Sequence, residues 1–175
     1  MKWSARPLAL LLLALLLFAC RPSTGSPAVD ETPTPSQETT ANVYVAPEGW
    51  SFRYPAAWER VESGFVQDAE TGKTITFESA PSTEGELEAW IASEIERKLA
   101  ATEADNTLLE PLSVSQQDGL AVYRYAIRSR MEARDTVLRT TVFLDGSRRY
   151  AFYAAVAPVT EEEYALVVGS FSTPQ

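Results

Sequence analysis

Apolar side chains recur at every second position in the first part of the folded region. The stretch Trp50–Tyr54 alternates aromatic with polar residues, and Thr74–Glu78 alternates apolar residues with polar ones. Because successive side chains of a strand point to opposite faces, this spacing predicts two half-buried strands, with the aromatic residues in the core. Pro55 ends the first strand, and Trp58–Val61 predicts a short continuation. Gly72 supplies the positive φ of the turn that precedes the second strand.

The pattern then changes to helical spacing. Apolar residues at three- and four-residue intervals, with charged residues between them, predict an amphipathic helix. They are Leu87, Trp90, Ile91, Ile95 and Leu99. Thr83 and Glu86 have the spacing of a capping box, so the helix is expected to begin at this point.

Strands are predicted again after Pro111. The candidate strands are Leu112–Gln116, Leu120–Arg128, Val137–Leu144 and Arg149–Val156. Tight-turn sequences separate them at Gln117–Gly119 and at Asp145–Gly146. The last candidate is apolar throughout, as in a central strand covered on both faces, although a buried helix has the same pattern.

A second amphipathic helix is predicted at the end of the chain. Pro158 ends the preceding strand, and Thr160 and Glu163 form a second capping box. Tyr164, Val167, Val168 and Phe171 then follow at helical spacing. The acidic run Glu161–Glu163 has an alternative interpretation as a calcium site, but acidic residues in a first helical turn are explained by the helix dipole. The element order predicts an α+β fold, an antiparallel β-sheet flanked by helices.

The N-terminus has a different pattern. Lys2 and Arg6 precede an apolar run from Leu8 to Ala19, which is shorter than the roughly 20 residues of a membrane-spanning helix. The run therefore predicts a signal peptide over residues 1–19. Its end, Leu17-Phe18-Ala19-Cys20, resembles the bacterial lipobox, which implies cleavage before Cys20 and lipidation of its thiol, with palmitate among the acyl chains. The alternative is a free or buried thiol.

Residues 20–42 are rich in Pro, Ser and Thr, and this composition predicts a disordered tether rather than a packed structure. The folded domain is then expected over 43–175. Together these features predict a lipoprotein of the bacterial cell envelope, held on the extracytoplasmic face of the cell membrane by the acyl chains on Cys20. Each buried methylene of such a chain contributes about 0.8 kcal/mol.

Charge and composition exclude several classes of function. The net charge is −9, which argues against binding nucleic acid or anionic lipid directly. The chain has no histidine, the commonest general base and metal ligand, and its single cysteine is assigned to lipidation. No serine-hydrolase motif occurs. We therefore expect that the protein is not an enzyme and that it binds no metal and no cofactor.

The string Phe52-Arg-Tyr54-Pro55-Ala-Ala-Trp58, preceded by Gly49, resembles the opening of PsbP-like domains. The later order of helix, long strands and terminal helix is similar too. The resemblance implies an α-β-α sandwich, the PsbP/Mog type, and a non-enzymatic accessory role. It does not extend to photosystem binding, because here the domain is acidic and the N-terminus is a lipid tether.

Six arginines form the candidate binding patch of this acidic domain. They are Arg124, Arg128, Arg130, Arg139, Arg148 and Arg149. The first three share one strand face, and the others lie on the next strands, so strand pairing is expected to gather them. The alternative is that they pair with helix carboxylates or lie solvated on the sheet. The leading hypothesis is a tethered module that binds a protein partner near the membrane; the second is a sensor that binds a small anionic ligand through the arginines.

Overall fold

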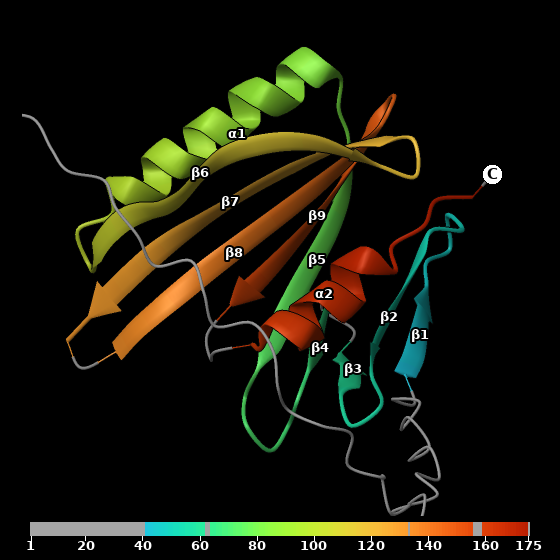
Figure 1. The fold of residues 1–175 in the computed structure, drawn as a ribbon, viewed down its shortest axis with the longest axis horizontal. Coiled ribbons are helices and arrows are strands. Elements are labelled where there is room, and N and C mark those ends of the chain that lie inside the picture. The colour runs from blue at the N-terminus through green and yellow to red at the C-terminus, as the bar shows by residue number, and fades with distance from the viewer. Residues whose placement is uncertain (1–40, 62–63, 133, 156–158, 175) are drawn as a thin grey trace, which may run out of the picture. The chain divides into compact units, whose positions relative to one another are not determined.

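A seven-stranded antiparallel sheet is the centre of the domain (Figure 1). The computed structural model describes residues 41–61, 64–132, 134–155 and 159–174. The strands lie in the order β3 (Glu59–Val61), β4 (Phe65–Gln67), β5 (Thr74–Pro81), β9 (Arg148–Ala155), β8 (Arg134–Asp145), β7 (Leu120–Met131) and β6 (Asp105–Gln117). The predicted antiparallel sheet is confirmed. The predicted signal peptide, Cys20 and most of the tether lie outside the described residues, as do Val156 and Pro158.

A separate two-stranded ribbon consists of β1 (Ala41–Val45) and β2 (Ser51–Pro55). The second strand coincides with the one predicted from Trp50. The first was not predicted, and it begins two residues before the expected domain boundary, because Ala41 and Asn42 pair with Pro55 and Tyr54.

Helix α1 (Glu84–Leu99) packs on one face of the sheet. Leu87 and Ile91 are fully buried against β7, β8 and β9. At the start of the helix the Glu86 carboxylate accepts a hydrogen bond from the Thr83 backbone N–H (2.8 Å), as the capping-box spacing predicts.

Helix α2 (Glu161–Gly169) packs on the opposite face together with the ribbon. Its capping box is complete, since Thr160 N–H donates to Glu163 (2.8 Å) and Glu163 N–H donates to Thr160 Oγ1 (3.2 Å). Phe171 lies beyond the helix end but is buried, as predicted. The layer on this face is therefore half helix and half β-ribbon, whereas the α-β-α sandwich expectation describes a helical layer on each side.

Two hydrophobic cores result, one on each face of the sheet. The core under α2 and the ribbon is aromatic, and Phe52 lies at its centre with ring centroids 5.0–5.3 Å from Tyr44, Phe77 and Phe152. Trp50 and Tyr54 are buried in the same core. The prediction that the aromatics of this strand are core residues is confirmed.

Strand β6 differs most from the prediction. It begins at Asp105 rather than after Pro111, and it continues through the proline. Proline is tolerated here because β6 is an edge strand and its register with β7 shifts between Glu110 and Ser113. A proline at a bulge of an edge strand costs no ladder hydrogen bond, so the rule that ended the predicted strand does not apply.

The predicted turns are found where their residues indicate. Asp118 and Gly119 both have positive φ (51° and 84°), as a two-residue hairpin of the primed type requires, and Gly146 has a φ of 51°. Strand β4 was not predicted, and β7 and β8 extend further than expected, to Met131 and from Arg134.

Replacement of Phe52 by alanine tests the aromatic core. We expect Phe52→Ala to lower the free energy of unfolding by about 3–5 kcal/mol, because its side chain is fully buried and the cavity cannot be refilled by water. Urea denaturation followed by tryptophan fluorescence measures the loss. Val45→Ala on the exposed side of the ribbon is the control and should change stability by less than about 0.5 kcal/mol. Equal effects of the two substitutions would contradict this description of the core.

Candidate functional site

Four of the six predicted arginines lie close together on the sheet face that carries α2. Arg124, Arg128 and Arg130 alternate along β7 and share this face with the buried Val122. Arg139 lies on β8 opposite Ala126, and so between Arg124 and Arg128 of the neighbouring strand. Strand pairing therefore brings these four residues together, as the sequence predicted.

Arg148 and Arg149 are separated from them. Arg149 lies on the α1 face, where its guanidinium stacks 4.2 Å from the Trp90 ring centroid and lies 3.6 Å from Glu78. Arg148 is beside the β8–β9 turn and donates a hydrogen bond to Ser79 (3.3 Å). The six-residue patch is thus divided: Arg149 points to the α1 face, whereas Arg148 shares the face of Tyr150 and Phe152 but lies at the turn end of β9.

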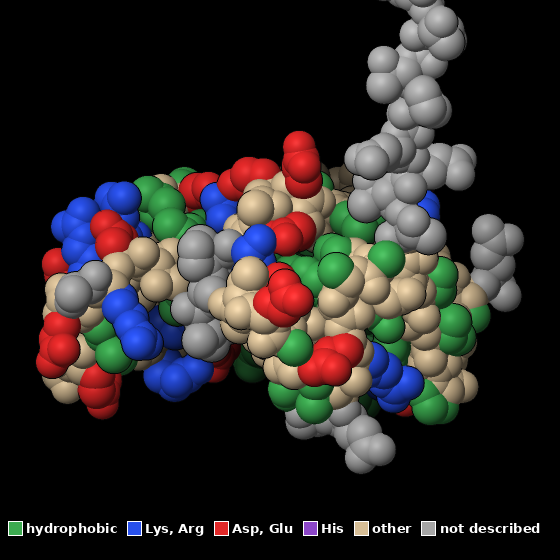
Figure 2. Space-filling model, turned by 90° about the horizontal axis from the view of Figure 1, so that it is seen from below, with side chains coloured by type: hydrophobic (Ala, Val, Ile, Leu, Met, Phe, Trp, Pro, Cys, Tyr) green, Lys and Arg blue, Asp and Glu red, His purple; other side chains and the backbone are tan. Residues whose placement is uncertain are grey.

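Carboxylates neutralise most of the remaining patch. Arg128 and Arg130 both pair with Asp135, at 3.1 and 3.4 Å. Arg139 pairs with Glu161 at the start of α2. The alternative of pairing with helix carboxylates is therefore correct for Arg139, whereas Arg128 and Arg130 pair with a carboxylate of the neighbouring strand β8. On the face seen in Figure 2, basic side chains accordingly lie beside acidic ones rather than in one continuous basic area.

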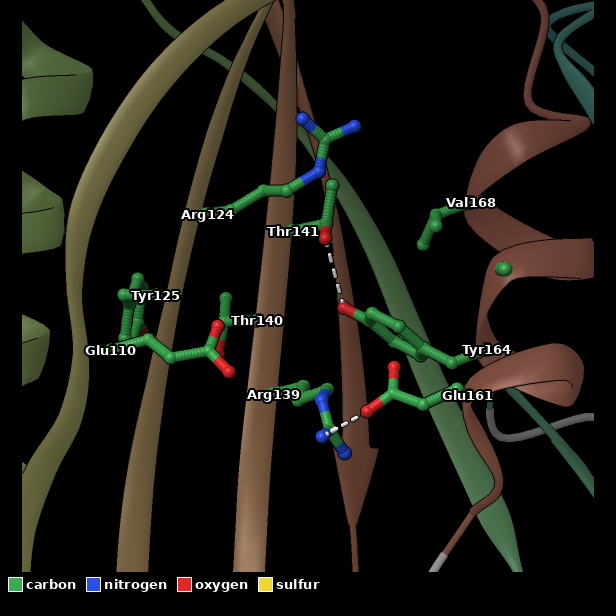
Figure 3. A pocket seen from close by; sticks show the side chains of 10 residues that line it. Glu110, Arg124, Tyr125, Arg139, Thr140, Thr141, Glu161, Tyr164 and Val168 are labelled. Carbon is green, nitrogen blue, oxygen red and sulfur yellow. Dashed lines mark hydrogen bonds and ion pairs between the residues drawn. The ribbon is translucent and has the colours of Figure 1, made fainter. Parts of the chain in front are cut away.

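Arg124 is different, because among the described residues its guanidinium contacts only neutral acceptors. It donates hydrogen bonds to Ser115 (2.8 Å) and to Gln117 (3.2 Å) of β6. It lines a pocket of about 230 Å³ between the sheet and α2, which we call the α2 pocket. Arg139, Thr141, Glu110 and Tyr164 also line it (Figure 3).

Tyr164 supplies a fixed hydroxyl to this pocket. Its single proton can be accepted by Thr141 Oγ1 (3.0 Å) or by the Phe152 carbonyl (3.3 Å). Burial raises the pKa of Tyr164, so the group stays protonated at physiological pH. Guanidinium and hydroxyl groups suit recognition of a small polar or anionic group. The sequence had assigned Tyr164 only to the helix core, since its spacing does not reveal which polar group its hydroxyl meets.

The sequence also did not predict the two carboxylates that line the α2 pocket, Glu110 and Glu161. Glu161 was explained by the helix dipole, and nothing near it in the sequence indicates a contact with Arg139. Glu110 lies before Pro111, in a stretch that was not predicted to be a strand. A contact between residues 22 positions apart leaves no local signal.

The acidic start of α2 has structural partners. Besides capping the helix, Glu163 pairs with Lys73 (2.8 Å), which ties α2 to the turn before β5. Although burial opposes ionisation, the hydrogen bonds from Lys73 and Thr160 lower the pKa of Glu163. Within the described ranges, no three potential metal-ligating side chains come together. The helix-start interpretation of Glu161–Glu163 is confirmed by these contacts.

A second notable surface is the outer edge of β6. Four large apolar side chains there are well exposed, and we call them the apolar edge: Leu108 (41%), Leu109 (44%), Leu112 (39%) and Val114 (59%). Asp105 and Glu110, on the same strand, are exposed as well. Exposed apolar groups that cluster on one element are typical of interaction surfaces.

None of the helices in the described part of the chain combines the length and apolar character that crossing a membrane requires.

Comparison with known proteins identifies the fold. No protein-family model matches the chain, and no curated protein does so. Among solved structures, the chain is similar to cyanobacterial PsbP (CyanoP) from Synechocystis sp. PCC 6803, with a TM-score of 0.59 and 14% identity over 80% of this chain and 96% of that one. A protein from Bacteroides thetaiotaomicron VPI-5482 is 10% identical over 76% of this chain and 48% of that one. Its TM-score of 0.38 is too low to indicate a shared fold. The first similarity shows a PsbP-like fold, as the Phe-x-Tyr-Pro-x-x-Trp string predicted.

Proposed function

We propose that this chain, which has a PsbP-like fold, is a lipid-anchored, extracytoplasmic accessory module that binds a partner protein beside the membrane and catalyses no reaction. The observation that carries the binding role is the apolar edge: four exposed apolar side chains on one strand of a domain that is otherwise strongly acidic.

The anchoring part of the proposal rests on the N-terminal sequence. The apolar run stops at Cys20, and the residues before it resemble a lipobox. Two or three acyl chains on one cysteine hold a protein at a membrane almost permanently, since each methylene adds about 0.8 kcal/mol. The first strand begins at Ala41, so twenty residues separate the proposed anchor from the domain.

The non-enzymatic part is supported by composition and fold. The chain contains no histidine, and its single cysteine would carry the lipid. The PsbP-like fold agrees with an accessory role. No cofactor is part of the proposal.

The partner's chemistry follows from the surface of β6. A contacting segment needs apolar side chains to cover Leu109 and Val114, and basic side chains to match Asp105 and Glu110. Pro111 and the register shifts interrupt the outer edge of β6. Side-chain contact should therefore dominate over addition of a long continuous strand. We assign to this edge a basic, apolar segment of a partner protein.

Binding of a small anion is the second candidate function, and Arg124 favours it. This guanidinium contacts neutral acceptors in the α2 pocket, so a ligand carboxylate there would gain charge-assisted hydrogen bonds. Glu110 and Glu161 in the same pocket restrict the ligand, because they repel an anion with more than one charge.

Mass analysis of the full chain expressed in a bacterium tests the anchor. The mature protein should lack residues 1–19 and carry acyl mass on Cys20, and it should sediment with membranes. Cys20→Ser should keep residues 1–19 and gain no lipid, because the lipid is attached to the cysteine sulfur. Ser23→Ala is the matched control and should behave as the wild type. A mature wild-type protein without acyl mass would overturn the anchoring proposal.

Affinity capture from solubilised membranes tests the apolar edge. Wild-type chain should retain one partner in a constant ratio, and the double variant Leu109→Lys, Val114→Lys should lose it. Lysine on an edge strand is well tolerated, so the fold should survive. Val43→Lys, Val45→Lys on the equally exposed outer face of β1 is the control and should retain the partner. High salt should weaken the complex because it screens complementary charges. Undiminished capture by the β6 variant would exclude this surface.

A thermal-shift titration tests the second candidate. Acetate, glutamate and inorganic phosphate are added separately to the wild type and to Arg124→Gln. If the α2 pocket binds anions, a monocarboxylate should raise the unfolding temperature of the wild type more than that of the variant. Arg148→Gln, at the β8–β9 turn, is the control and should respond as the wild type. The absence of any shift in the wild type would eliminate the anion-binding role and leave the protein-binding role untouched.

A further inference from the structure

A second pocket lies on the opposite face of the sheet, beside the last turn of α1. Hydroxyl-bearing residues form a continuous row across four strands there, because Thr76, Tyr153, Thr140 and Tyr125 are successive cross-strand partners on β5, β9, β8 and β7. Lys98, one residue before the end of α1, extends over this row. Its ammonium lies 5.2 Å from the ring centroid of Tyr153 and 5.7 Å from that of Tyr125.

The pocket has a volume of about 260 Å³ and a mixed lining. Leu138 and the ring of Tyr153 supply apolar surface, while Lys98, Thr76 and Thr140 supply donors. Arg139 and Ala154 also line the pocket, although both belong to the α2 face of their strands. Sites for drug-sized molecules have volumes of about 300–1,000 Å³, so this one fits a smaller ligand.

The Lys98 ammonium lacks a direct ion-pair partner among the described residues, and Glu94, one turn earlier, acts on it only at longer range. Within the same residues it donates no hydrogen bond. The nearby carboxylates are already engaged: Glu94 pairs with Arg97 (2.8 Å), and Glu78 pairs with Arg149 (3.6 Å) and accepts a hydrogen bond from the Tyr153 hydroxyl (3.1 Å).

The surroundings of Lys98 make this charge costly. Burial lowers the pKa of its ammonium, and the two aromatic rings offer only partial compensation through cation–π contact. Lys73 provides a contrast, because its ammonium lies 2.8 Å from the Glu163 carboxylate. This partly desolvated cation has no ion-pair partner among the described residues and lies beside apolar side chains. An anionic ligand would therefore stabilise it.

We propose that this Lys98 pocket binds a small monocarboxylate with an apolar body. The carboxylate pairs with the Lys98 ammonium, and the apolar body lies against Leu138 and the Tyr153 ring. Phosphate fits less well, because a doubly charged group needs several cationic donors and has no apolar part for the walls. The sequence did not indicate this site, since Lys98 belongs to a helix and the hydroxyl row arises from strand register.

The probe is 4-fluorobenzoate, titrated into the full chain in detergent and observed by fluorine NMR line broadening. Wild type should bind it in the millimolar range or tighter. Lys98→Met keeps the length of the side chain but removes the charge, and it should weaken binding at least about tenfold. Lys73→Met is the matched control and should bind as the wild type. The unfolding temperature and circular dichroism of each variant confirm that it is folded.

Two further arms separate charge from apolar contact. The uncharged 4-fluorobenzyl alcohol should bind much more weakly than the carboxylate, and it also measures partition into detergent. Leu138→Ala should weaken 4-fluorobenzoate while leaving acetate unchanged, because only the former reaches the apolar wall. Equal binding by the wild type and Lys98→Met, equal binding of acid and alcohol, or no binding by the wild type would each overturn the proposal. None of these outcomes bears on the lipid anchor or the apolar edge.

Discussion

Packing of aromatic side chains between the sheet and its mixed second layer is the interaction on which the domain depends. The β1–β2 ribbon has no strand pairing with the seven-stranded sheet, and an isolated two-stranded hairpin is marginally stable in water. Its link to the C-terminal segment is a short bridge between Ser51 and Ser172. Burial of Phe52, Trp50 and Tyr44 against Phe77 and Phe152 must therefore hold the ribbon in place. The same layer includes α2, so the α2 pocket exists only while this core is intact.

Charge is distributed unevenly over the two faces of the sheet. On the α2 face Arg128, Arg130 and Arg139 have carboxylate partners on the neighbouring strand and on α2, and the exposed pairs contribute little stability. These pairs neutralise a patch that would otherwise be basic. On the α1 face the nearby Glu94 and Glu78 pair with Arg97 and Arg149, and Lys98 has no ion-pair partner among the described residues. A cation without a partner in a partly closed pocket is a stronger indication of a ligand than a larger group of paired arginines.

The PsbP-like fold by itself does not determine an activity, because one fold supports many functions and activity depends on particular sites. Three sites are distinguished on this domain: the apolar edge of β6, the α2 pocket and the Lys98 pocket. They have different chemistry, since the first offers apolar area with acidic neighbours, the second two guanidiniums with two carboxylates, and the third a lysine ammonium over aromatic rings. The two pockets share Arg139 and Thr140 of β8, and Glu110 of β6 lines the α2 pocket, but Lys98, Arg124 and Leu109 each belong to one site alone.

The amino-acid sequence alone determined the features that depend on neighbours along the chain. Alternation at Trp50–Tyr54, helical spacing from Leu87 and from Tyr164, both capping boxes and the Asp118–Gly119 turn all act within a few residues, and each predicted its element. Only the tertiary structure decided the rest. Whether Pro111 ends a strand depends on its place at a sheet edge. Whether Arg149 joins the patch depends on the face to which it points, and whether Arg148 does so depends on its position along β9. The pairing of Arg139 with Glu161 and the position of Lys98 over Tyr153 join residues far apart in sequence. Such contacts arise from strand register and helix packing, which no local pattern encodes.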